Sequence, residues 1–168
     1  MAQDRKYEGL GPITLSIMDR LLDMEPKVRT ELQITYKKSL EITRASLRRD
    51  LENLLNTRCT EVPLPQGSHQ LERSLYMYGL PDITSLSSNY LHDQNRLLLA
   101  VEETLRIFEP RLSPVRVTLV PSSGATRVLR FVIEGMLRID PAPEHVVFDA
   151  SLELISGEYE ILGDARAG

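Results

Sequence analysis

The period of the hydrophobic pattern changes once along the chain, close to Pro110. Before this point, apolar residues recur at the three- and four-residue spacing of an amphipathic helix, over Ser39–Thr57 and again over Asp93–Phe108. Pro110 ends the second helix, because the residue before a proline avoids the helical backbone conformation. After it, apolar and polar residues alternate, as they do in strands with one buried face. The sequence therefore predicts helices first and a sheet afterwards.

Four alternating segments follow Pro110, separated by short turns. Residues 115–119 and 129–133 flank a turn at Pro121–Gly124 and predict a hairpin. A long strand over Val146–Leu154 and a short one over Glu158–Leu162 come next. Strands joined by short turns pair antiparallel. We therefore predict an α+β fold in which N-terminal helices precede a mainly antiparallel C-terminal sheet within a single domain.

The segment between the two long helices carries turn and stop signals. Two prolines and a glycine within Cys59–Ser68 predict a surface loop. Gln70–Tyr78 predicts a short helix or turn, which Gly79 closes because glycine suits a left-handed cap. Pro81 follows shortly after and prevents the helix from resuming.

The first residues are expected to behave differently from the rest. Residues 1–14 are polar and interrupted by Gly and Pro, and we predict a flexible N-terminal arm there, with the folded domain over residues 15–168. The domain opens with a short amphipathic helix over Ser16–Asp23. Such a helix can pack on its own domain or dock into a partner's groove, and the sequence leaves both options open.

The composition argues against several classes of protein. A single Cys among 168 residues allows neither an intramolecular disulfide nor a zinc site built on paired Cys. No apolar run approaches the length of a bilayer span, so we expect a cytoplasmic protein without direct membrane insertion. The net charge of −4 argues against a general nucleic-acid binder.

The charges are nevertheless distributed unevenly. Between Lys37 and Arg58 six bases face three acids, whereas from Glu134 onward eight acids face two bases. These stretches are either two solvated faces or complementary contacts in an assembly. Nucleic-acid binding by the basic helix ranks last, because no aromatic residues are interleaved for base stacking.

The sequence contains no strong catalytic or metal-binding motif. His69, His92 and His145 lie far apart without metal-ligand spacing, so we expect no metal site and no cofactor. A glycosidase needs two carboxylates across a cleft, and we keep this activity only as an alternative to a non-enzymatic role. Its candidate carboxylates would be Asp82, Glu102, Glu103 and Glu109.

The most unusual local feature is the tripeptide Glu109-Pro110-Arg111. Pro110 imposes an extended bend, so Glu109 and Arg111 can project to the same side and form one charged edge. Carboxylate and guanidinium groups make strong, directional hydrogen bonds, so this edge could bind a partner. The alternative is a local salt bridge or a cap on the preceding helix.

Five short stretches stand out by their order and spacing: Ser16–Leu21, Asp50–Arg58, Tyr78–Asp82, Phe108–Leu112 and Phe131–Gly135. Together they resemble the TssE family, the small baseplate subunits of bacterial type VI secretion systems, which are related to the baseplate wedge protein of contractile phage tails. The Glu-Pro-Arg tripeptide is the hallmark of that family.

The resemblance implies a structural subunit rather than an enzyme. It implies binding to the wedge proteins TssF and TssG, contact with TssK through the assembled wedge, and initiation of the contractile TssB/TssC sheath at the cytoplasmic face of the inner membrane. It also implies that Glu109, Pro110 and Arg111 bind the wedge, and that Ala substitutions of the two charged residues weaken assembly without disturbing the fold. A sheet edge could exchange strands with the first sheath ring. The candidate sheath-facing strand holds Val146, Phe148, Ala150, Leu152 and Leu154, with an ordinary internal strand as the alternative.

Overall fold

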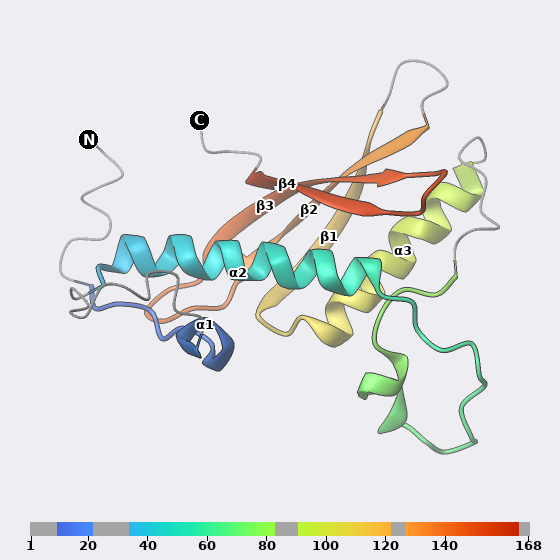
Figure 1. Ribbon diagram of the computed structural model, residues 1–168, viewed down its shortest axis with the longest axis horizontal. Coiled ribbons are helices and arrows are strands. Elements are labelled where there is room, and N and C mark those ends of the chain that lie inside the picture. The colour runs from blue at the N-terminus through green and yellow to red at the C-terminus, as the bar shows by residue number, and fades with distance from the viewer. Residues whose placement is uncertain (1–9, 22–33, 83–90, 122–126, 165–168) are drawn as a thin grey trace.

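The computed structural model describes residues 10–21, 34–82, 91–121 and 127–164. Helices precede a four-stranded sheet along the chain, and the two long helices lie against one face of that sheet (Figure 1). On this face, helix α2 lies over the half of the sheet that ends at β4, and helix α3 lies over the half that ends at β1. The arrangement is a single α+β domain, as the change of hydrophobic period predicts. None of the described helices is long and apolar enough to cross a membrane.

The two long helices confirm the helical pattern. Helix α2 spans Tyr36–Asn56 and starts three residues before the predicted boundary, because the Thr35 hydroxyl accepts a hydrogen bond from the Lys38 N–H and caps it. Helix α3 spans Leu91–Phe108. Both helices bury their apolar stripe in the core. The core residues of the stripes are Leu40, Leu47, Leu51, Leu54 and Leu55 on α2 and Leu97, Val101 and Leu105 on α3.

The connection between these helices contains two short 3₁₀ helices, η2 (Leu71–Arg73) and η3 (Leu75–Met77), within the segment Gln70–Tyr78, for which the sequence predicts a short helix or turn. Gly79 has a positive φ of 113°, as predicted for a left-handed residue. A Cβ at this position would lie 2.4 Å from the carbonyl oxygen of Thr57. Gly79 thus lets the chain pass close to the end of α2, where Leu80 pairs with Arg58.

The sheet is antiparallel throughout and its strands lie in sequence order. The strands are β1 (Leu112–Val120), β2 (Val128–Leu137), β3 (Glu144–Glu153) and β4 (Tyr159–Asp164). Alternate residues of β2 face the core, and Phe131 and Ile133 are almost fully buried. The predicted hairpin and the two later strands are confirmed.

The candidate sheath-facing strand is internal. Strand β3 pairs with β2 over its whole length and with β4 from Phe148 to Leu152, so most of its backbone groups are already bonded on both sides. Leu154 lies just beyond β3, and its N–H donates to the carbonyl of Arg127. The prediction of a sheath-facing edge here is wrong, because hydrophobic alternation does not distinguish an edge strand from an internal one. The side chains of Val146, Phe148, Ala150 and Leu152 belong to the core.

The N-terminal region packs more than the sequence predicts. Ile13 is buried, and its N–H donates to the Ser39 hydroxyl on α2 over 2.9 Å. Ile13 therefore belongs to the folded domain, whereas the predicted flexible arm extended to residue 14. Residues 1–9 lie outside the described part. The short helix α1 spans Ile17–Leu21, and residues 22 and 23 of the predicted helix also lie outside the described residues.

Candidate functional site

The Glu-Pro-Arg tripeptide forms the junction between α3 and β1. The Glu109 N–H still donates to the Leu105 carbonyl as the last bond of the helix, and the Leu112 N–H donates to the Glu109 carbonyl. Pro110 is exposed at the corner. On the far side of the bend, the Arg111 carbonyl accepts from the Arg138 N–H over 2.7 Å. The backbone at this junction is therefore fixed on both sides.

Glu109 and Arg111 form a two-pronged ion pair. Arg111 Nε donates to Glu109 Oε1 and Arg111 Nη2 donates to Glu109 Oε2, each over 2.6 Å. Only 5% of Glu109 is exposed, whereas 33% of the Arg111 side chain is exposed. Both side chains project to the same side, as predicted from the bend. The local salt bridge that the sequence left as the alternative is present, and contact with a partner stays a prediction.

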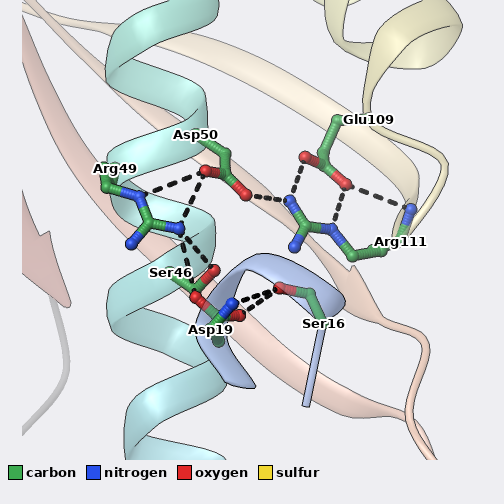
Figure 2. A network of polar contacts seen from close by, with 7 residues as sticks. All are labelled: Ser16, Asp19, Ser46, Arg49, Asp50, Glu109 and Arg111. Atoms are coloured by element: carbon green, nitrogen blue, oxygen red, sulfur yellow. Dashed lines mark hydrogen bonds and ion pairs between the residues drawn. The ribbon is translucent and has the colours of Figure 1, made fainter. Parts of the chain in front are cut away.

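A third charge joins this pair from α2. Arg111 Nη2 also donates to Asp50 Oδ2 over 2.7 Å, and Asp50 in turn contacts Arg49 of the same helix. Figure 2 shows Asp50 between the two arginines, facing the junction. Hydrogen bonding to Glu109 raises the pKa of Arg111, so the guanidinium keeps its charge.

Arg111 keeps donors to spare. A guanidinium has five N–H donors, and Glu109 and Asp50 occupy Nε and Nη2. Within the described residues, Nη1 makes no hydrogen bond; in Figure 2 it points away from both carboxylates. The ion pairs thus hold Arg111 in one orientation while leaving part of its fork to bind another group.

Helix α1 is joined to the same network by the hydrogen bonds of Asp19. Asp19 Oδ1 accepts from Arg49 Nη2 over 3.1 Å, and the Ser16 hydroxyl bonds to Asp19 (Figure 2). Burial opposes ionisation of Asp19, yet hydrogen bonds from Ser16, Ser46 and Arg49 together lower its pKa. The apolar side chains of α1 point outward instead, with Ile17 75% exposed and Leu21 74% exposed.

Tyr78 completes the surroundings of the junction. Its ring packs edge-on against Phe108 with 5.4 Å between the ring centroids. Burial, together with the negative charges of Asp50 and Glu109, raises the pKa of the Tyr78 hydroxyl. The ring contact therefore places Tyr78, the residue before Gly79, next to the end of α3.

A cavity of about 510 Å³ opens beside this network. It lies between the N-terminal segment, α2 and the segment that follows β2. Its lining combines apolar side chains with the charges of the network. Among the lining residues are Ile13, Asp19, Thr43, Arg111, Leu137 and Arg138.

The junction brings together stretches that are distant in the sequence. Four of the five stretches that resemble the TssE family meet here, and they contribute Asp19, Asp50, Tyr78 and Glu109–Arg111. Gly135 comes from the fifth, and a Cβ there would lie 2.8 Å from the carbonyl oxygen of Pro114, close to the junction. Sequence reasoning missed Asp50 as the partner of Arg111, because nothing local links residues 61 positions apart.

The other candidate residues serve different contacts. Glu102 accepts a hydrogen bond from the Val117 N–H, Glu103 pairs with Arg106, and Asp82 is exposed. His145 contacts Glu134. In the described part of the chain, no group of three or more His, Cys, Asp or Glu side chains could hold a metal.

The fold and the junction define a small α+β domain organised around an ion-paired turn between a helix and a strand. A family model described as Baseplate wedge protein gp25 matches residues 41–142, which is more than half of the 168 residues. The chain belongs to this family of baseplate wedge proteins. A search of curated proteins gave no match. Membership assigns the chain a structural role in the baseplate of a contractile tail and implies contacts with other baseplate components.

Proposed function

We propose that the chain is a TssE-type subunit of a type VI secretion baseplate. In this role it binds the wedge proteins TssF and TssG, reaches TssK through the assembled wedge, and starts polymerisation of the TssB/TssC sheath. It would act in the cytoplasm, in a baseplate docked at the inner-membrane face. The observation that supports the proposal best is the convergence of the stretches that resemble the TssE family on the Glu109–Arg111 junction, where Asp50 and Glu109 both bond to Arg111.

The wedge contact is proposed at Arg111 and the exposed Pro110. Glu109 and Asp50 hold the guanidinium in place, so little side-chain entropy is lost when Nη1 binds a partner carbonyl or carboxylate. Glu109 itself is buried, and its role in this contact is to position Arg111. The cavity beside Arg111 offers space for a partner side chain.

The sheath contact is proposed at an outer strand of the sheet. Strand addition requires an edge with backbone groups to offer, and the edges are β1 and β4. The internal strand β3 takes no part in it.

The test is co-purification of TssF and TssG with the native chain and with Arg111→Lys. Lysine keeps the charge but lacks the planar fork, so we expect weaker capture by a folded variant. Arg106→Ala is the matched control, because Arg106 is an exposed, ion-paired arginine on α3. Equal capture of the native and Arg111→Lys chains would remove Arg111 from the interface, and no capture of the native chain would argue against the proposal as a whole.

We also propose that the chain is not a peptidoglycan glycosidase. Glu109, the most buried of the candidate carboxylates, has both oxygens bonded to Arg111, so neither oxygen is free to approach a glycosidic bond. Muramidase turnover by the purified chain, lost on removal of one candidate carboxylate, would contradict this proposal.

A further inference from the structure

The two outer strands of the sheet differ in how completely their backbone is covered. On β4, Asn56 of α2 bonds to both backbone groups of Tyr159: Asn56 Nδ2 donates to the Tyr159 carbonyl, and the Tyr159 N–H donates to Asn56 Oδ1, each over 2.8 Å. Tyr159 is 1% exposed and Ile161 is 0% exposed, so the backbone at both positions is covered. A second strand therefore cannot reach β4 along this stretch.

Strand β1 is more open. Its pairing with β2 is regular from Val115 to Val120. In an antiparallel pair, the backbone groups of every second residue point away from the partner strand. The Val117 N–H bonds to Glu102 and not to β2, so the outward groups belong to Val115, Val117 and Leu119. Val115 and Leu119 are only partly buried, so β1 keeps a row of backbone groups with which a strand can pair.

This row begins after Pro114. Proline has no N–H to offer, and the pairing of β1 with β2 is irregular between Leu112 and Val115. A regular partner strand is therefore expected only along Val115–Val120.

Glu102 occupies the middle of the row. Its Oε1 accepts the Val117 N–H over 2.7 Å, which is the bond that a carbonyl oxygen of an added strand would accept. The carboxylate belongs to a flexible side chain of α3, so it can leave this position without any movement of the backbone. Arg106 is exposed one helical turn further along α3, where it pairs with Glu103 and can also receive the released carboxylate.

We infer that β1 is the outer strand that accepts a strand of the sheath, and that Glu102 holds the Val117 N–H until this strand displaces it. The inference rests on the proposed sheath contact and selects one of the two outer strands for it. The partner is defined by its chemistry as an extended segment that offers backbone N–H and carbonyl groups along residues 115–120. Glu102 lies outside the Glu109–Arg111 junction, so the sheath contact and the wedge contact involve different residues.

The first test is photo-crosslinking in baseplates that carry sheaths. The crosslinking residue is introduced by Thr118→p-benzoylphenylalanine on β1 or Glu160→p-benzoylphenylalanine on β4, both exposed positions on the face of the sheet away from the helices. We expect crosslinks to TssB or TssC from position 118 and none from position 160. A crosslink from position 160 that equals or exceeds the one from position 118 would overturn the inference, and so would sheaths that assemble without a crosslink from position 118.

A proline on β1 tests the backbone contact itself. Leu119→Pro removes an outward N–H and keeps the groups that pair with β2, whereas the control Leu119→Ala loses the leucine side chain but keeps the N–H. We expect both folded variants to capture TssF and TssG, and only Leu119→Ala to restore sheaths in a strain without the native chain. Restored sheaths with Leu119→Pro would overturn the inference, and the crosslinking result decides if Leu119→Pro does not fold. A native chain that captures neither TssF nor TssG would instead contradict the proposed function.

Hydrogen exchange tests the role of Glu102 in the free subunit. The Val117 amide should exchange roughly tenfold faster in Glu102→Ala than in the native chain, because one hydrogen bond is lost. Glu103→Ala is the matched control, since Glu103 is an exposed residue of the same helix, and it should leave this rate unchanged. An unchanged rate in a folded Glu102→Ala variant would overturn the role assigned to Glu102.

Discussion

Replacing Arg111 by Ala should lower the free energy of unfolding more than replacing its partner Glu109 by Ala. Glu109 is only 5% exposed and both of its oxygens bond to Arg111. Arg111→Ala therefore leaves a buried carboxylate without its partner. Glu109→Ala instead leaves a guanidinium that retains Asp50 and is one-third exposed to water. The sequence alone predicted that neither substitution disturbs the fold, and the burial of Glu109 changes that expectation for Arg111→Ala.

The size of this loss of stability depends on how deeply the Glu109–Arg111 ion pair is buried. Breaking a fully buried ion pair costs about 3–5 kcal/mol, and the exposed part of Arg111 lowers this to about 2–3 kcal/mol. Glu109→Ala should cost about 1–2 kcal/mol, because water can replace part of the lost hydrogen bonding. In a domain of this size each kcal/mol lowers Tm by about 2–4 °C.

The assay is denaturant unfolding of both variants and of the double variant at pH 7. The double variant should be no less stable than Arg111→Ala, since it removes the unpaired carboxylate together with the arginine. Arg106→Ala is the control for loss of an exposed arginine. The reasoning is refuted if Arg111→Ala unfolds within about 0.5 kcal/mol of the native chain, or if Glu109→Ala is the less stable of the two variants.

Four further substitutions test three separate parts of the structure. Because the pKa of Asp19 is lowered in the folded state, its ionised carboxylate stabilises the fold above pH 3.8, and this stabilisation is lost as the pH falls through the lowered pKa. The free energy of unfolding, measured as a function of pH, should therefore decrease less at acid pH for Asp19→Asn than for the native chain. Gly79→Ala should cost about 2 kcal/mol or more, since its Cβ would meet the Thr57 carbonyl. Gly67→Ala, with positive φ but open space, should cost about 1 kcal/mol in the same assay, and equal costs would contradict the steric argument. Burial raises the pKa of Tyr159, so stability should fall as the pH rises above 10.0 in the native chain, and less so in Tyr159→Phe.

The sequence predicts the elements of this fold well because each one carries its own local pattern. The leucines of α2 and the alternation in β2 and β3 are short-range signals, and Gly79 marks its own conformation. The strand order and the edges are long-range properties, which explains why β3 could be mistaken for a sheath-facing edge.

The same limit applies to the junction. The bend at Pro110 predicts that Glu109 and Arg111 point the same way, and they do. The third member, Asp50, comes from another helix, and only the packing of α2 against the sheet brings it to Arg111. Helix α1 gives a further example. The sequence left open whether its apolar side packs on the domain, and in the structure Asp19 faces the domain while Ile17 and Leu21 face outward.

The most direct test of the baseplate role is sheath formation in the bacterium that encodes the chain. With the gene deleted, a fluorescently labelled TssB subunit should remain dispersed, and the native chain supplied in trans should restore assembled sheaths. Sheaths that assemble normally in the deletion strain would contradict the proposed role.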